Sequence, residues 1–337
     1  MASSTQASVM VKGVPWMDDG SIVLRAQHTH FRVHKSVLAR NAEVFADMFE
    51  MPQPDGSSDD QDVVEGCVVV EVADDPVELG HFLRAMYDGW RYFKHDIALP
   101  FEAITGLIRL GTKYQAPHLR DEGTSRLPSV LDSLMNCDES SSTPLELHKR
   151  RCAITLANLA QTHDLEAFLP QALYACCQIP EEHLREGLPH AKDTAKERED
   201  LALTLLPINL SRVQHAKPLL AAHTAAILHS MSTTLGTTKA CRRAHSDDDD
   251  TSRPQCWSAA IPAPGSVALS NPIRWLQVWS GSVVRAWTCS PGCVMNVRAF
   301  GAKKEEEVKR NLAGFFGLPA RTSAATGLGK AQSQAVV

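Results

Sequence analysis

The stretch FRVHKSVLARNAEVFADMFE, residues 31–50, constrains the fold most, because the spacing of its apolar residues changes from that of a strand to that of a helix. Before the change, residues 21–26 are mostly apolar and residues 30–34 alternate, with QHT between them, which predicts a β-hairpin. From Val37 onward the apolar residues recur on one helical face. The sequence therefore predicts a strand pair that leads directly into a helix facing the core.

A third strand and three more helices are predicted further along the chain. The run CVVVEVAD, residues 67–74, is rich in β-branched residues and predicts a buried strand. Asp75 and Pro76 are typical of a helix N-cap and first helical residue, and Gly89 is expected to end that helix. A proline separates two further helical segments. This order of elements predicts an α+β fold for residues 18–132, with a short three-stranded sheet and a cluster of helices.

The rest of the chain is predicted to be mainly α-helical and less well ordered toward its end. Residues 165–176 have the apolar spacing of an amphipathic helix. An acidic, serine-rich stretch precedes this helical region, and sequence with few apolar residues follows it, as is typical of linkers. We expect a flexible N-terminal tail, the α+β domain, a linker, a helical region and a weakly ordered cysteine-containing tail, at residues 1–17, 18–132, 133–144, 145–231 and 232–337.

The composition argues against several classes of function. Hydrophobic residues make up 44% of the 337 residues and charged residues 22%, which is typical of a globular protein. The formal charge of −5 gives no general attraction to phosphate or anionic lipid, so neither nucleic acid nor membrane is an expected partner. Nine cysteines without a secretory signal indicate a reducing compartment, which predicts an intracellular protein of the cytoplasm or nucleus.

His34 and Lys35, at the junction of strand and helix, are the first candidates for chemistry. Catalysis would need a nucleophile or a carboxylate beside them, but the sequence has no G-x-S-x-G, H-E-x-x-H or Cys-Gly-x-Cys signature. We therefore expect neither an enzyme nor a cofactor. The structural interpretation is that His34 bonds to backbone groups near the helix entrance. Lys35 is unfavourable to the helix dipole at this position, which indicates a nearby carboxylate.

Four cysteines toward the C-terminus, Cys241, Cys256, Cys289 and Cys293, are the candidates for a metal site. Four thiolates can hold a structural zinc ion, and Cys289 and Cys293 flank a Pro-Gly pair that predicts a turn. Structural zinc ligands usually come in pairs separated by about two to four residues, however, and Cys241 and Cys256 are much further apart. Unrelated thiols are the favoured interpretation. The alternative is a zinc-binding or nucleic-acid-associated regulator that acts through this tail.

Three segments together resemble the BTB/POZ domain. They are DGSIVLRAQHTHFRVHKSVLARNAEVFADMFE, VVVEVADDPVELGHFLRAMYDG and ITGLIRLGTKYQAPHLRDEGTSRL. They carry H-K-x-x-L-A followed by F-x-x-M-F, a strand ending in Asp, a helix ending in Tyr-x-G and a helix ending in K-Y. The first-strand Asp matches only with a small insertion, and the loop at residues 51–65 is longer and more acidic than is typical of the family.

The resemblance covers roughly residues 18–132, and it implies a protein–protein interaction module that forms homo- or heterodimers. It further implies a substrate adaptor of a cullin-type ubiquitin ligase, with a cullin scaffold as partner, or a transcriptional co-regulator. The sequence LPF before the long helix is similar to that of BTB proteins from mushroom-forming, basidiomycete fungi.

The resemblance also implies which residues meet the partner. In BTB dimers a basic residue of the first helix lies close to the Asp at the first strand, so Asp19 is expected to pair with Lys35 or Arg40. The helix would supply apolar surface, and a symmetric dimer needs only one self-complementary patch. The expected interaction residues are Asp19, His34, Lys35, Leu38, Arg40, Phe45, Met48 and Phe49.

Overall fold

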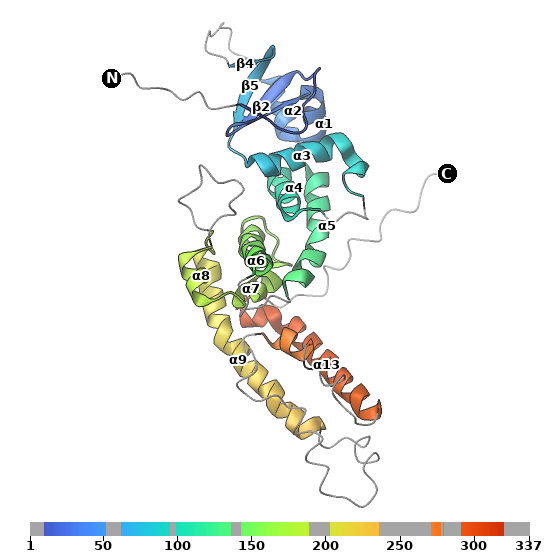
Figure 1. Ribbon diagram of the computed structural model, residues 1–337, viewed down its shortest axis with the longest axis vertical. Coiled ribbons are helices and arrows are strands. Elements are labelled where there is room, and N and C mark those ends of the chain that lie inside the picture. Colours follow the sequence, from blue (N-terminus) through green and yellow to red (C-terminus); the bar gives the residue numbers. More distant parts are fainter. Residues whose placement is uncertain are drawn as a thin grey trace, which may run out of the picture. The chain divides into compact units, whose positions relative to one another are not determined.

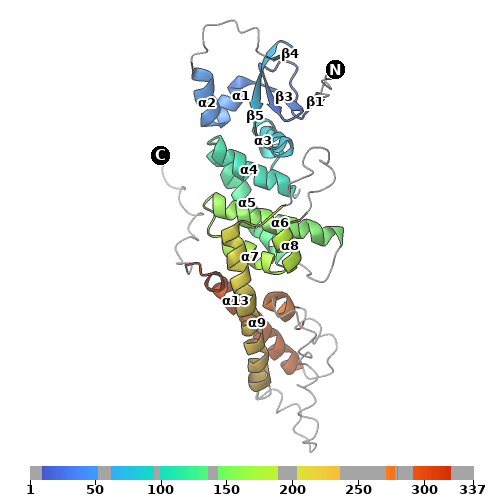
Figure 2. The same cartoon turned by 90° about the vertical axis from the view of Figure 1, so that its left-hand side faces the viewer.

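The computed structural model forms two compact units, Met1–Val130 and Leu131–Val337 (Figure 1). The described residues are 10–51, 62–94, 99–135, 143–188, 203–235, 271–277, 279 and 291–319. The first unit combines a sheet with helices, and the described elements of the second are helices, apart from one isolated bridge between Leu188 and Leu203 (Figure 2). This is the α+β fold class that the sequence predicts.

The sheet of the first unit has the strand order β1-β3-β2-β5-β4. Its centre is the predicted hairpin of β2 (Ile22–Ala26) and β3 (Thr29–Val33), which is antiparallel, together with β5 (Cys67–Val72), which runs parallel to β2. Two very short strands complete the edges: β1 (Val11–Lys12) pairs parallel with β3, and β4 (Val63–Val64) pairs antiparallel with β5. The sheet therefore has five strands where the sequence predicts three.

β1 lies in the range that the sequence predicts to be a flexible tail, and this part of the prediction is wrong. The Val11 N–H donates to the His28 carbonyl at 3.0 Å, and the Gly13 N–H donates to the His30 carbonyl at 2.8 Å. A strand of two residues has too few positions to show alternation, so sequence periodicity cannot reveal it. Tertiary backbone hydrogen bonds order this segment instead.

The predicted helix after the hairpin consists of two helices, α1 (Lys35–Asn41) and α2 (Glu43–Glu50). The break is at Ala42, which has an extended backbone with φ −146°. The first N–H groups of α2 then donate to the loop after α4: Glu43 to the Gln115 carbonyl at 3.4 Å and Val44 to the Tyr114 carbonyl at 3.3 Å. These bonds satisfy amides that a helix start otherwise leaves without partners.

The third helix, α3 (Pro76–Asp88), begins and ends as predicted. The Asp75 carboxylate accepts the N–H groups of Val77 at 2.8 Å and Glu78 at 3.1 Å, and Pro76 opens the first turn. Gly89 ends the helix with φ +50°, a conformation that other residues adopt only with strain. The short 3₁₀ helix η1 (Gly89–Arg91), α4 (Phe101–Lys113) and α5 (Pro117–Leu134) follow.

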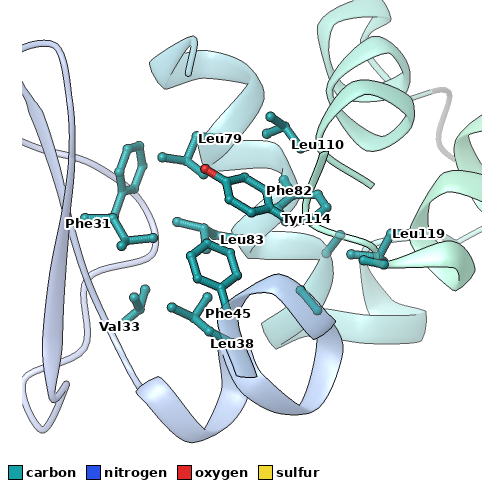
Figure 3. Packing of buried hydrophobic residues seen from close by; sticks show 14 of the residues in the cluster. Phe31, Val33, Leu38, Phe45, Leu79, Phe82, Leu83, Leu110, Tyr114 and Leu119 are labelled. Atoms are coloured by element: carbon teal, nitrogen blue, oxygen red, sulfur yellow. The ribbon is translucent and has the colours of Figure 1, made fainter. Parts of the chain in front are cut away.

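The core of the first unit lies between the sheet and these helices. Figure 3 shows side chains from β3, α1, α2, α3, α4 and α5 that point into one shared cluster. At its centre the Tyr114 ring stacks on the Phe45 ring, with centroids 4.4 Å apart, and lies 5.9 Å from the Phe82 ring. Aromatic contacts of this kind stabilise the fold beyond the burial of apolar surface. Through them Tyr114 connects α2 and α3 to the end of α4.

The second unit contains α6 (Pro144–Thr162), α7 (Leu169–Cys177), α8 (Glu181–Glu186), α9 (Pro207–Leu235) and α13 (Pro291–Phe315). Helices α9 and α13 run side by side in both views (Figure 1). The buried Tyr174 hydroxyl donates to Asn271 Oδ1 at 2.6 Å and accepts the Ile273 N–H at 3.1 Å. This residue of α7 therefore fixes the segment at residues 271–277.

The prediction of a weakly ordered tail over residues 232–337 is wrong for two segments. Residues 272–277 are helical and bury Trp275, and α13 buries Val297, Val308 and Leu312. The charged run in α13 forms the solvated face that its sequence indicates, with Lys304–Glu307 and Lys309–Glu305 ion pairs at 2.8 Å. Apolar residues this widely spaced give a weak local signal, and the packing partners are distant in sequence. Among the described helices, none is long and apolar enough to cross a bilayer.

Candidate protein interaction surface

The junction between β3 and α1 is held by a hydrogen-bond network that connects three elements. The backbone N–H of His34 donates to Tyr87 Oη at 2.8 Å, and Tyr87 Oη lies 2.9 Å from His34 Nδ1. His34 Nε2 lies 3.1 Å from the Asp19 carboxylate. In the neutral imidazole all three contacts are satisfied if Tyr87 donates to Nδ1 and Nε2 donates to Asp19. We call these three residues the His34 network.

The His34 network corrects one expectation. The imidazole bonds to the side chains of Tyr87 and Asp19, whereas the sequence predicted bonds to backbone. Within the chain Asp19 pairs with His34, and its pairing with Lys35 or Arg40, which the resemblance implies for a dimer, stays a prediction. The hydrogen bond from His34 lowers the pKa of Asp19, and burial raises the pKa of Tyr87. His34 therefore positions the start of α1 by joining it to α3.

Lys35 is exposed, and its backbone and side chain have separate roles. Its N–H donates to Ser21 Oγ at 3.0 Å, so Ser21, the residue before β2, caps α1. Its ammonium group lies 5.7 Å from the centre of the Phe49 ring, a cation–π distance. Arg40 is exposed in the last turn of α1, where a positive charge is favourable to the helix dipole. Both charges are thus presented to solvent.

The apolar residues proposed for the interface divide into two groups. Leu38 and Phe45 are fully buried, so they hold α1 and α2 on the core and cannot contact a partner. Met48 and Phe49 are half-buried and pack against the core from outside. Met51, which the sequence reasoning missed because it follows the end of α2, is 62% exposed. We define the α1–α2 surface as Lys35, Arg40, Met48, Phe49 and Met51.

A second network joins the end of β5 to α4. The Asp74 side chain is only 5% exposed, and it accepts hydrogen bonds from the Tyr114 hydroxyl and from Lys113 Nζ, the latter at 2.5 Å. Burial and the neighbouring Asp74 charge raise the pKa of Tyr114, so its hydroxyl remains a donor at neutral pH. These are the Asp that ends the third strand and the K-Y pair of the sequence motif.

A second buried carboxylate, Glu78, joins α3 to α4. It accepts hydrogen bonds from Thr105 Oγ1 at 2.9 Å and from Arg109 Nη1 at 2.8 Å. Burial raises the pKa of Glu78, although the charge of Arg109 acts in the opposite direction. Gly106 permits the close approach of the two helices, because a Cβ there would lie 2.9 Å from the Glu78 Cβ. This pair of helices is therefore closely fitted as well as hydrogen-bonded.

The candidate metal ligands are largely outside the described residues. Cys241, Cys256 and Cys289 lie there, and only the backbone of Cys293 is described, within α13. Pro291 and the glycine after it begin this helix and do not form the expected turn. In the part of the chain that the structure describes, no group of three or more His, Cys, Asp or Glu side chains is placed to hold a metal ion. A zinc site remains a prediction from sequence.

The first unit thus has a rigid α+β frame, two buried networks and an exposed helical surface, which define a module for protein contact. Residues 19–130 match the family model of the BTB/POZ domain, so this part of the chain is a BTB/POZ domain. BTB/POZ domains are protein–protein interaction modules and not an enzyme family. No curated protein matches the chain. The likeness to basidiomycete proteins stays a prediction.

Proposed function

We propose that this chain is a non-enzymatic interaction protein that self-associates through the α1–α2 surface. The observation that supports the proposal is Met51, an apolar side chain 62% exposed beside the half-buried Met48 and Phe49. Met48 and Phe49 pack against the core beneath them, so little conformational entropy is lost when these two side chains are covered. Exposed apolar side chains that lie together are typical of interfaces.

The charges of the two helices favour a second copy of the same chain as the partner. Helix α1 exposes Lys35 and Arg40, whereas α2 exposes Glu43, Asp47 and Glu50. A twofold axis can bring α1 of one copy against α2 of the other, so that each basic helix meets an acidic one. The same patch then serves both copies, as a symmetric dimer requires.

The BTB/POZ domain also supports two finer roles for such a dimer. One is a substrate adaptor, in which a cullin scaffold binds the domain and the helical second unit holds a target. The other is a transcriptional co-regulator, in which the dimer recruits further proteins. In both roles the chain connects two other proteins, and its function is to bind them through its surface.

The proposal is tested by the molar mass of the full chain in solution, measured by light scattering after size exclusion. We expect twice the 36.9 kDa chain mass at tens of micromolar, about the concentration at which an interface of modest size is occupied. Met51→Asp should shift the mass to that of one chain. Leu145→Asp is the matched control, because Leu145 is 63% exposed in the second unit. A monomeric wild-type chain would reject the proposal.

Charge reversal tests the symmetry of the proposed contact. Lys35→Glu with Arg40→Glu makes one variant, and Glu43→Lys with Asp47→Lys makes the other. Each variant alone should be monomeric, since like charges then face each other across the axis. An equimolar mixture should recover the dimer mass, because each basic helix again meets an acidic one. A mixture that stays monomeric would contradict the paired-helix arrangement.

A further inference from the structure

The segment after α3 carries an exposed aromatic side chain that the core of the first unit does not use. Trp90 in η1 is 72% exposed, the most exposed of the large hydrophobic side chains in the described part of the chain. The tyrosine and phenylalanine that follow it are half-buried. Tryptophan is the side chain most enriched among residues that dominate binding energy at protein interfaces. Trp90 is therefore a candidate contact for a partner protein.

The residues around Trp90 are fixed by side-chain contacts. Tyr92 Oη lies 2.7 Å from His81 Nδ1, and the Phe93 ring meets the Tyr92 ring edge-on, with centroids 5.2 Å apart. Arg126 Nη2 donates to the Phe93 carbonyl at 3.2 Å, which attaches the segment to α5. A surface held in this way is preorganised, so binding orders few additional groups.

The charges around Trp90 are mainly positive. Arg91 Cζ and Lys94 Nζ lie 5.9 and 5.7 Å from the centre of the Trp90 ring. Arg84 Cζ lies 5.4 Å from the centre of the Tyr92 ring. Asp88 is the one carboxylate among residues 84–94, and it lies 3.8 Å from Arg84. The surface is thus locally basic, although the whole chain has a formal charge of −5.

We propose that the Trp90 surface, made of Arg84, Trp90, Arg91 and Lys94, binds an acidic segment of a partner protein. An apolar side chain of that segment covers Trp90, and its carboxylates pair with Arg91 and Lys94 beside the ring and with Arg84 beside Tyr92. Electrostatic complementarity determines the specificity for the partner and speeds association, while the tryptophan contributes most of the affinity. This inference does not rest on self-association through the α1–α2 surface.

A short peptide fits this surface better than a nucleic acid does. Nucleic-acid grooves follow a long backbone with many cations and several stacking rings, and their affinity grows with the number of phosphates neutralised. The Trp90 surface offers one exposed ring and three cations on a chain that is acidic overall. Salt screens the interaction between charges that lie more than about 8–10 Å apart. A short acidic segment therefore interacts with the local cations and hardly with the net negative charge of the whole chain.

The test begins with a library of random peptides of about twelve residues, a length typical of linear recognition segments, displayed on phage and selected against the full chain. We expect the selected peptides to be enriched in Asp and Glu and to contain an apolar residue. One of them, synthesised with a fluorescent label, is then used to measure Kd by anisotropy. Trp90→Ala should weaken binding about tenfold or more, as truncation of a central interface tryptophan does.

Matched controls separate the Trp90 surface from general effects. Leu145→Ala removes another exposed apolar side chain, and Lys303→Glu with Arg310→Glu reverses two exposed charges in the second unit. Both controls should bind the peptide like wild type, whereas Arg91→Glu with Lys94→Glu should abolish binding. Because Trp90 is exposed, circular dichroism and Tm should be the same for Trp90→Ala and wild type.

Three results would overturn the inference. These are selected peptides without acidic enrichment, peptides that bind Trp90→Ala as tightly as wild type, and a single-stranded DNA of about twenty nucleotides that displaces the peptide and itself depends on Trp90. Binding is also measured in Met51→Asp. Since the two surfaces share no residue, the peptide should bind that variant unchanged even if self-association fails.

Discussion

Replacement of Tyr114 by phenylalanine tests whether the buried Asp74–Tyr114 contact holds the BTB/POZ domain together. The substitution keeps the ring, which is buried and stacks on Phe45 at 4.4 Å between centroids. It removes only the hydroxyl that donates to the Asp74 carboxylate. The perturbation is therefore confined to one hydrogen bond to a charged group.

The magnitude follows from the burial of Asp74. A hydrogen bond to a charged group contributes about 1.5–3 kcal/mol, and the cost is highest where the abandoned partner is buried. The Asp74 side chain is 5% exposed but keeps Lys113 at 2.5 Å, which limits the penalty. We therefore expect a loss of about 2 kcal/mol, which for a domain of about 120 residues lowers Tm by about 6–10 °C. The raised pKa of Tyr114 keeps its hydroxyl protonated, so the loss should persist from about pH 6 to 9.

The assay is urea unfolding of residues 10–135, followed by far-ultraviolet circular dichroism. The slope of the unfolding free energy against urea should not change, because the same surface is exposed on unfolding. Tyr92→Phe is the matched control: it removes a hydroxyl 2.7 Å from a neutral, half-buried His81 and should cost about 0.5–1 kcal/mol. If Tyr114→Phe costs no more than this control, the reasoning about Asp74 is wrong.

Two further predictions concern the other buried contacts. Burial raises the pKa of Glu78, so the folded wild type binds more protons than the unfolded chain above about pH 4.5 and loses stability as pH rises through the raised pKa. Relative to Glu78→Gln, the unfolding free energy of wild type should therefore fall as pH rises from about 4.5 through this raised pKa. A rise with pH would show that the charge of Arg109 affects the pKa of Glu78 more than burial does. Tyr87→Phe leaves the His34 N–H without its 2.8 Å acceptor and should cost about 1–2 kcal/mol in urea unfolding, and an unchanged midpoint would contradict this role of the His34 network.

The parts of the fold with strong local signals were predictable from the sequence. The hairpin, the strand at residues 67–72 and the helix between Asp75 and Gly89 follow from alternation, β-branched composition and capping residues. The edge strands β1 and β4 have two residues each, too few for a period. The break at Ala42 depends on carbonyl groups of residues 114 and 115, more than seventy positions away. Such contacts leave no mark on local spacing.

The candidate site was predictable in its residues but not in its contacts. The motif indicates His34, Lys35 and Asp19, but it does not show that Asp19 contacts His34 within the chain. The spacing of one sequence cannot show that residue 34 meets residue 87. Met51 was missed because it follows the helix end, where amphipathic spacing no longer applies, and its exposure is a property of the folded surface.

The contacts divide the motif residues into those that hold the frame and those that meet a partner, and this division decides how variants are interpreted. Tyr87, which bonds to His34, lies in the last turn of α3, and Asp74, which bonds to Tyr114, lies just before the first turn. The two networks therefore fix this helix at both ends. Substitutions there should lower stability, and any lost association would follow from the damaged frame. Lys35 presents its ammonium group to solvent, so Lys35→Glu should change association while Tm stays near that of wild type. Although His34 and Lys35 are adjacent in one motif, their contacts differ: the histidine supports the fold, and the lysine is exposed to solvent.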